Sequence, residues 1–269
     1  MDSFWLRVVL SFLVGGTWLM LVSVVAEKSS AKLAALLGGL PSTILIALFF
    51  IGLNEGPHFA AKAVTVTPIT LIIDAFYMLF MAAYASKGYF KSLIIFSACW
   101  SIIMWLVVVF KFNAYLISLS IWALGLIILV NVADKILPAK ATKLSNVTFT
   151  RRQLLARSLF SGTVIAFTVL ISRYSGPIVS GIFTAFPAVY LSTYTILYFA
   201  RGLTFSQTVI KPLTISGTIN VIVYGLAVYI FYPRFGIYTG TVMAFIISLL
   251  SSFYGVRYVL NYLANKQGI

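Results

Sequence analysis

One acidic side chain lies in the middle of a long apolar segment. Asp74 stands at the centre of the apolar run 71–76, and a charged group at the centre of a membrane helix costs about 2.5–3.5 kcal/mol on insertion scales. Thr67 and Thr70 precede it by seven and four residues, so the three share one helical face. Their oxygen atoms suit a proton or a small cation.

A second polar stripe occurs later in the chain. Thr214 and Thr218 lie four residues apart, and Asn220 is adjacent to them. If the two segments face each other, the stripes together form a coupling site for an ion or a proton. The alternative is structural: Asp74 locks two helices together by a hydrogen bond, and the threonines bond to carbonyls of their own helices.

Two predicted helices contain glycine and proline at membrane depth. Their interrupted segments are 38–43 and 180–187, and freed backbone groups at that depth are tolerated only against protein or a water-filled cavity. We expect these segments to line a substrate site; the alternative is that small residues allow close helix packing. The expected lining residues are Gly38, Gly39, Pro41, Ser42, Thr43, Thr184, Pro187, Tyr190 and Tyr194.

Tyrosines recur every four residues at Tyr190, Tyr194 and Tyr198. Such a stripe runs too deep for an interfacial belt alone, which would occupy only the helix ends. It is typical either of a pathway lined with hydroxyl groups or of aromatic packing, and the sequence leaves both open.

Glu55 and His58 flank a Gly-Pro pair and are candidates for a gate, or simply for a polar interfacial loop. One histidine and one carboxylate are too few for a dedicated transition-metal site. The sequence has no P-loop, nucleophile elbow, metalloprotease pair or paired intramembrane aspartates. We therefore expect neither an enzyme nor a cofactor. Cys99, the one cysteine, lies within an apolar run and is expected to be a small packing residue.

Composition indicates which environment must hold these residues. The 269 residues are 61% hydrophobic and 9% charged, with 5 acidic and 19 basic side chains, whereas a soluble domain is about a quarter charged. A soluble enzyme, a disulfide scaffold and a disordered chain are therefore excluded. The basic residues are scattered singly, which argues against nucleic-acid binding. The fold class predicted is all-α, a polytopic helical membrane protein.

The apolar runs predict nine transmembrane helices, because a bilayer core needs roughly 20 residues per helix. The first lacks the features of a cleaved signal peptide and is expected to be retained. The nine spans are 4–26, 33–53, 60–84, 90–110, 113–132, 154–172, 178–200, 208–231 and 236–262.

Nine spans divide the basic residues between the two sides as fourteen against five. The side richer in Lys and Arg is normally cytoplasmic, so we expect the N-terminus outside and the C-terminus inside an inner (cytoplasmic) membrane. The basic stretch 133–153 would lie against anionic headgroups.

The chain also compares well with itself. Pro41 and Pro68 are 27 residues apart, and Pro187 and Pro212 are 25 apart. The implied organisation is a four-helix repeat (1–111), a linker helix with a basic loop (112–153) and a second four-helix repeat (154–269). An odd linker helix makes the two repeats insert with opposite orientation, an arrangement typical of secondary transporters.

The second half resembles the GlpM-like family of small bacterial four-helix membrane proteins. The residues that carry the resemblance are Ser175-Gly176-Pro177, Ser180-Gly181-Ile182-Phe183, Phe186-Pro187 and Arg201-Gly202, with a looser match at Gly38-Gly39-Leu40-Pro41 and Phe49-Phe50. The resemblance implies a fused, tandem version of that unit and supplies no substrate or functional residues.

The function predicted is a secondary transporter of a small solute or ion, coupled to a proton or cation and working as a monomer or homodimer among membrane lipids. Asp74 would carry the coupling. The alternatives are a passive channel or lipid-handling protein that uses the same cavity, and a non-transporting scaffold with a dry interface between the repeats.

Overall fold

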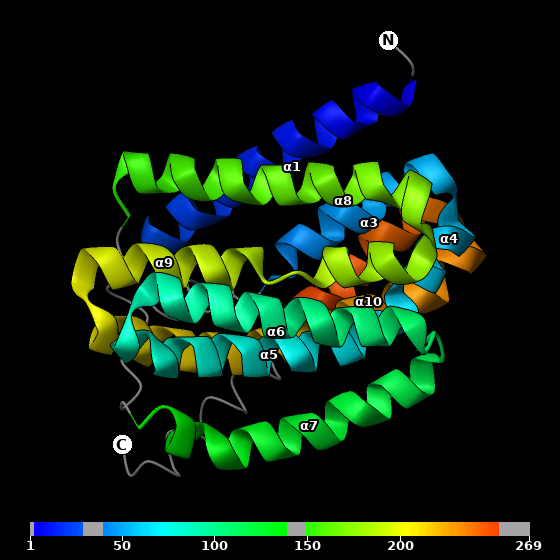
Figure 1. Cartoon of the computed structure of the whole chain (residues 1–269). Coiled ribbons are helices and arrows are strands. Elements are labelled where there is room, and N and C mark those ends of the chain that lie inside the picture. Colours follow the sequence, from blue (N-terminus) through cyan, green and yellow to red (C-terminus); the bar gives the residue numbers. More distant parts are fainter. Residues whose placement is uncertain (1–2, 29–39, 139–148, 253–269) are drawn as a thin grey trace.

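The computed structural model describes residues 3–28, 40–138 and 149–252, and all regular structure in these ranges is helical (Figure 1). In chain order the helices are α1 (Ser3–Lys28), α3 (Ser42–Glu55), α4 (Pro57–Ala63), the 3-10 turn η1 (Val64–Val66), α5 (Thr67–Tyr84), the 3-10 turn η2 (Ala85–Lys87), α6 (Tyr89–Val109), α7 (Tyr115–Ile136), α8 (Arg151–Ala185), α9 (Ala188–Arg201) and α10 (Leu203–Ser251).

Six helical stretches among the described residues are long and apolar enough to cross a membrane. They are Ser3–Val25, Pro57–Lys87, Tyr89–Val109, Tyr115–Ile136, Arg151–Arg201 and Leu203–Ser251, and the shorter apolar helix Ser42–Glu55 makes a seventh. The expected count of nine separate helices is therefore wrong for this part of the chain. The expected boundaries at 172–178 and 231–236 are not loops, because the helical stretches continue through them.

Both long helices bend sharply at one glycine. Gly176 in α8 has φ 76° and ψ 175°, and Gly236 in α10 has φ 74° and ψ −178°. A positive φ of this kind is open to glycine without steric cost. The single-residue breaks explain why the sequence pattern indicated two spans in each place.

Contacts across the breaks show that each helix folds back on itself. In α8, the Thr168 hydroxyl donates to the Val164 carbonyl oxygen at 2.7 Å and also lies 3.3 Å from the carbonyl oxygen of Phe183. In α10, the hydroxyls of Tyr232 and Thr241 are 2.7 Å apart. Figure 1 shows the yellow-green limb of α8 returning towards α9 beneath the limb that precedes it. Each glycine therefore marks the turn of a helical hairpin.

Helices α3 and α9 match closely although they lie far apart in the sequence. Each has 14 residues, and each follows a proline of similar conformation: Pro41 with φ −76° and ψ 52°, Pro187 with φ −78° and ψ 46°. Each ends at a glycine of positive φ, Gly56 at 94° and Gly202 at 85°. The members of both pairs stand 146 residues apart.

Helices α1 and α8 meet through a reciprocal pair of glycines. A Cβ added at Gly16 would lie 3.1 Å from the Ser158 carbonyl oxygen, and one added at Gly162 would lie 2.8 Å from that of Phe12. Gly162 is 146 residues after Gly16, and Ser158 is 146 after Phe12. The two helices run antiparallel, with Arg173 over the Phe4 ring at one end and the Phe149 amide donating to Glu27 at the other.

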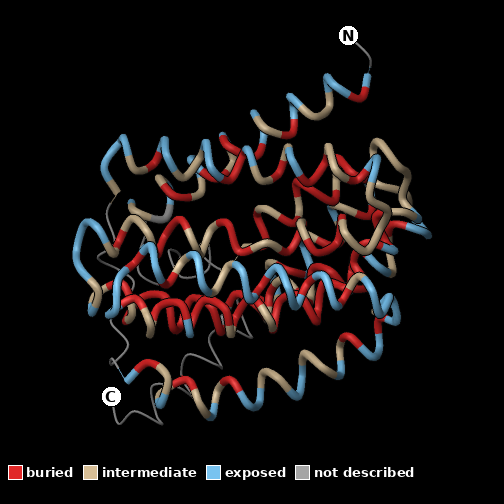
Figure 2. Tube along the Cα trace, viewed as in Figure 1, coloured by how far each residue is buried: buried red, intermediate tan, exposed pale blue. Residues whose placement is uncertain are grey.

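Burial separates a central layer from peripheral helices (Figure 2). Most of α5 is buried, and Met78, Leu79 and Met81 are fully covered. Helix α7 lies at the periphery and turns apolar side chains outwards, including Leu116 at 77% exposure and Leu124 at 64%. Exposed apolar side chains such as these suit the hydrocarbon core of a membrane. In that environment, helix association depends on close packing rather than on apolar burial.

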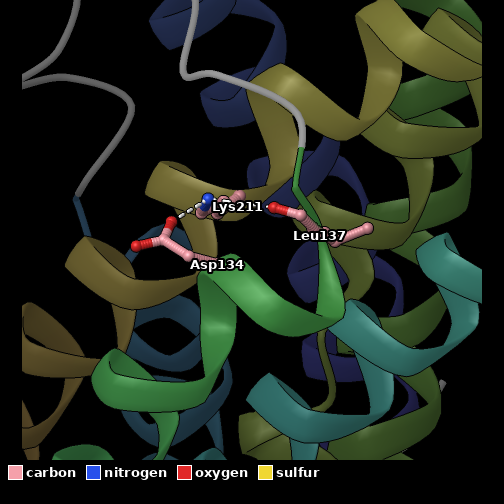
Figure 3. A network of polar contacts seen from close by, with 3 residues as sticks. All are labelled: Asp134, Leu137 and Lys211. Carbon is pink, nitrogen blue, oxygen red and sulfur yellow. Dashed lines mark hydrogen bonds and ion pairs between the residues drawn. The ribbon is translucent and has the colours of Figure 1, made fainter. Parts of the chain in front are cut away.

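Helix α7 is tied to α10 by a buried lysine (Figure 3). Lys211 is 4% exposed, forms an ion pair with Asp134, and donates to the Leu137 carbonyl oxygen at 3.0 Å. From the sequence, Lys211 was simply one of the cytoplasmic basic residues. In the structure it anchors the end of the linker helix, just before the basic residues at 139–148, which lie outside the described ranges.

Candidate solute or ion site

The start of α3 at Pro41 and the α8–α9 junction at Pro187 meet at a cavity of about 30 Å³. Its walls come from the start of α3, the α8–α9 junction, α5 and α10; the lining residues are Leu40, Pro41, Thr43, Ile44, Leu71, Thr184, Ala185, Phe186, Pro187, Ala188, Val189, Tyr190 and Val221. This volume holds one or two water molecules. The site as it stands therefore fits a small ion rather than a metabolite.

Eight of the thirteen lining residues stand at matching positions in the two halves of the chain. Four pairs contribute, namely Leu40 and Phe186, Pro41 and Pro187, Thr43 and Val189, and Ile44 and Tyr190. The members of every pair are 146 residues apart, the same interval that relates the ends of α3 and α9. The cavity thus lies where the two matching segments face each other.

The local sequence explains why polar backbone faces the cavity. Neither α3 nor α9 has a side-chain cap, and first-turn N–H groups have no partner within their own helix. The Ser42 and Ala188 amides donate to the carbonyls two residues before them, at 2.8 and 2.7 Å. The amides of the following residues remain at the positive ends of the helix dipoles, where they can donate to a small polar ligand.

Most of the expected lining residues that the structure describes reach the cavity. Pro41, Thr43, Thr184, Pro187 and Tyr190 line it. Ser42 is buried at the start of α3 without lining it, and Gly38 and Gly39 lie outside the described residues.

The tyrosine stripe leaves the cavity after its first member. Tyr194 is fully buried and its hydroxyl donates to the Ala82 carbonyl oxygen at 3.4 Å, and the Tyr198 hydroxyl donates to that of Ala85 at 3.5 Å. Tyr194 therefore does not line the cavity, contrary to the expectation from the sequence. Beyond Tyr190, the stripe packs against the end of α5, which agrees with the packing alternative.

Asp74 is buried on α5, with 2% of its surface exposed. One carboxylate oxygen, Oδ1, accepts a hydrogen bond from Trp100 Nε1 at 2.6 Å. The other, Oδ2, has no hydrogen-bond partner among the described residues. A buried carboxylate oxygen without a donor is costly, and a bound proton or cation would relieve that cost.

Trp100 was not among the residues selected from the sequence. It lies on α6, donates to Asp74, and packs edge-on against Phe186 with ring centroids 5.5 Å apart at 84°. Phe186 in turn lines the cavity. Asp74 thus stands one side-chain layer behind the cavity wall. The available signal was that a buried indole needs an acceptor.

The threonines of the two polar stripes divide into two groups. Thr70 donates to the Val66 carbonyl at 3.1 Å and Thr218 to that of Ile215 at 3.0 Å, as the structural alternative predicted. The hydroxyls of Thr67 and Thr214 are buried and find no partner in the described ranges.

Asn220, from the second stripe, is fully buried on α10. It stands 146 residues after Asp74, the interval that also separates Pro41 from Pro187.

Comparison with known proteins gives one match. Residues 154–259 match the model of a protein family of unknown function, DUF3147. The matched range covers α8, α9 and α10, which is less than half of the chain. No curated protein and no solved structure matches. The resemblance of the second half to GlpM-like proteins is thus unsupported, and DUF3147 replaces it as the related family for that half.

The expected gate residues straddle a turn at one end of the bundle. Glu55 ends α3, Gly56 forms the turn with φ 94°, and the exposed His58 lies in the first turn of α4. The contact that fixes this end comes from α1, whose Arg7 guanidinium donates to Asn54 Oδ1 at 3.2 Å and to the Leu53 carbonyl. Arg7 therefore fixes the C-terminal end of α3.

Proposed function

We propose that this protein is a secondary transporter of the inner membrane that moves a small ion or solute through the cavity between two inverted repeats. The observation that carries the proposal is the cavity itself, because eight of its thirteen lining residues form four equivalent pairs from the start of α3 and the α8–α9 junction. Broken helices that meet near the middle of a bundle are the usual construction of transporter sites.

The helical hairpins support the inverted arrangement. If the chain reverses at Gly176 and at Gly236, α8–α9 and α10 each cross the membrane twice, which makes nine crossings with α7 as the odd one. Residues 1–111 and 154–269 then enter from opposite sides.

The reciprocal contacts of Gly16 and Gly162 support this reading of the chain. A two-fold axis produces this kind of contact, because each partner presents the same surface to the other. With nine crossings, the charge bias places the N-terminus outside and the C-terminus in the cytoplasm.

The cavity also favours transport over the two alternatives. A scaffold would need a dry, closely packed interface at this point, whereas uncapped helix starts surround an open volume. A passive channel would have no use for a buried carboxylate with a free oxygen, and Asp74 supplies one. We assign to Asp74 the binding of the coupling proton.

The test replaces Asp74 with Asn, which keeps the shape and removes the charge. The protein is reconstituted in liposomes that contain a pH-sensitive dye, and gradients of sodium or potassium chloride or fluoride are imposed. We expect at least one gradient to move protons in the native protein, and Asp74→Asn to lower that flux at least about tenfold, a loss of about 1.4 kcal/mol in coupling.

The control is Glu27→Gln, which keeps an acceptor for the Phe149 amide at the end of α1 and should leave the flux unchanged. Equal fluxes in native protein and Asp74→Asn, or no proton movement with any of these salts, would remove the coupling role.

A further inference from the structure

Trp100 contacts both the Asp74 carboxylate and a residue of the cavity wall. Its indole Nε1 donates to Asp74 Oδ1 at 2.6 Å, and its ring meets Phe186 edge-on at 5.5 Å. Trp100 is 9% exposed, so most of its surface is covered by the rest of the protein. Helix α6 is otherwise peripheral, with five buried residues in its length of 21. This buried indole is therefore placed where a peripheral helix reaches the site.

Phe186 stands at the point where the cavity wall can change shape. It lies between α8 and α9 with φ −45° and ψ 132°, outside the helical region, and its amide donates to the Phe183 carbonyl at 3.3 Å. A ligand that bonds to the first-turn amides of α9 would pull on this junction directly. The ring of Phe186 would then move against Trp100.

The hydrogen bond from Trp100 affects how Asp74 holds a proton. A donor bonded to a carboxylate stabilises the charged form, and bonds of this type are short and strong. The titratable side chains that face Asp74 are the phenols of Tyr77 on α5 and Tyr190 on α9, which are uncharged near neutral pH. The indole is thus the donor that adjusts the proton affinity of this carboxylate.

We propose that Trp100 is a positioning residue that links Asp74 to the cavity wall, so that the geometry of the helix break at Phe186 sets how readily Asp74 binds a proton. The inference rests on the proposed role of Asp74 and adds the route by which occupancy of the cavity reaches it. Coupling then needs no direct contact between ligand and carboxylate.

Trp100 can report on this link through its own fluorescence. The sequence has five tryptophans, and replacing the other four (Trp5, Trp18, Trp105 and Trp122) with Phe leaves Trp100 as the one emitter. With protons as the probe, the emission of the full chain in liposomes is titrated from about pH 4 to pH 9, a range that spans the usual carboxylate values and shifts above them. We expect one transition, absent in Asp74→Asn.

The decisive variant is Phe186→Leu, with Phe183→Leu as its matched control. Phe183 lies in the same limb of α8 and forms an equivalent edge-on pair, but with Phe167, at 5.2 Å and 79°. Loss of the Phe186 ring frees the indole to rotate and weakens its bond to the carboxylate. The midpoint should rise by about half a pH unit or more, roughly a threefold change in proton affinity, and should not move in Phe183→Leu.

A second variant does not depend on the removal of four tryptophans. Trp100→Phe in the otherwise native chain keeps a ring against Phe186 and removes the N–H donor. The pH midpoint of dye-reported proton flux should rise, while Trp105→Phe, on the outer face of the same helix with 63% exposure, should leave it unchanged.

The outcomes separate the two proposals. A transition that depends on Asp74 but has the same midpoint in Phe186→Leu and Phe183→Leu overturns the link and leaves the role of Asp74 standing. A titration without any transition that depends on Asp74 overturns both. A transition that persists in Asp74→Asn shows that Trp100 senses another group, and this too would overturn the link.

Discussion

At the scale of single residues, the buried polar groups differ in how completely they are satisfied. Thr70, Thr218 and Lys211 have hydrogen-bond partners close by, whereas Asp74 Oδ2 has none in the part of the chain that the structure describes. A satisfied group stabilises a helix contact, and an unsatisfied one has capacity to bind a ligand. The buried hydroxyls of Thr67 and Thr214 share this lack of a partner within the described ranges, and Asp74 differs from them in being able to carry a charge, which is why we propose it as the coupling residue.

Replacing Lys211 and replacing Asp134 should destabilise the protein to different extents. Lys211 is buried, but the Asp134 side chain is 40% exposed. Asp134→Asn leaves a buried ammonium without its counter-charge, a loss of about 1–3 kcal/mol for such a partly exposed pair. Lys211→Met removes the buried charge and lets Asp134 be solvated, so it should cost less than half as much.

Thermal unfolding in detergent measures both variants of this pair. The native protein should have the highest unfolding midpoint, Lys211→Met an intermediate one and Asp134→Asn the lowest. The reverse order of the two variants would show that the carboxylate, not the ammonium, carries the burial cost.

At the scale of helices, glycine decides where the chain turns and how closely neighbours approach. Gly176 and Gly236 turn the chain at positive φ, and Gly16 and Gly162 bring α1 against α8. In lipid, where apolar burial does not drive helices together, such close approach is a main source of helix affinity.

Gly162→Ala is expected to weaken the contact between α1 and α8. Its Cβ would lie 2.8 Å from a backbone carbonyl oxygen, that of Phe12, so a helix must shift. Overpacking of this kind costs about 1–3 kcal/mol, which should appear as a lower thermal unfolding midpoint. Thr163→Ala, at the next and exposed position, serves as the control and should unfold like the native protein; equal midpoints for Gly162→Ala and this control would contradict the close packing.

At the scale of the whole molecule, one interval relates the two halves. Pro41 and Pro187, Gly56 and Gly202, and Asp74 and Asn220 are all 146 residues apart. The prolines Pro68 and Pro212 do not share it, since they are 144 residues apart. The halves thus share this interval at the ends of α3 and α9 and at positions 74 and 220, and they differ at Pro68 and Pro212.

Nine crossings predict which side of the membrane each turn occupies. After Cys99→Ser, single cysteines are placed at exposed positions by Phe110→Cys, Tyr174→Cys and Arg201→Cys and treated with a membrane-impermeant maleimide. The first two should react in intact cells, because both turns lie outside, and the third only after permeabilisation. If residues 151–201 crossed once, position 174 would be buried in lipid and unreactive, and position 201 would react from outside.

The sequence alone determined the properties that depend on composition and local chemistry. Apolar runs predicted helices near α1, α5, α6 and α7, proline and glycine predicted the breaks at Pro41 and Pro187, and a lone carboxylate in an apolar run singled out Asp74. The helix predictions succeed because helix length and backbone breaks are set by neighbouring residues, and the role of Asp74 stays a prediction.

Only the tertiary structure determined which residues that are distant in the sequence contact one another. It placed both breaks around one cavity, moved Tyr194 into the packing against α5, merged expected separate spans into helices that fold back at Gly176 and Gly236, and brought Trp100 between Asp74 and Phe186. None of these contacts is local: Trp100 lies 26 residues from Asp74 and 86 from Phe186 in the sequence. Such pairings arise from how whole helices pack, and periodicity within one helix carries no information about its partner.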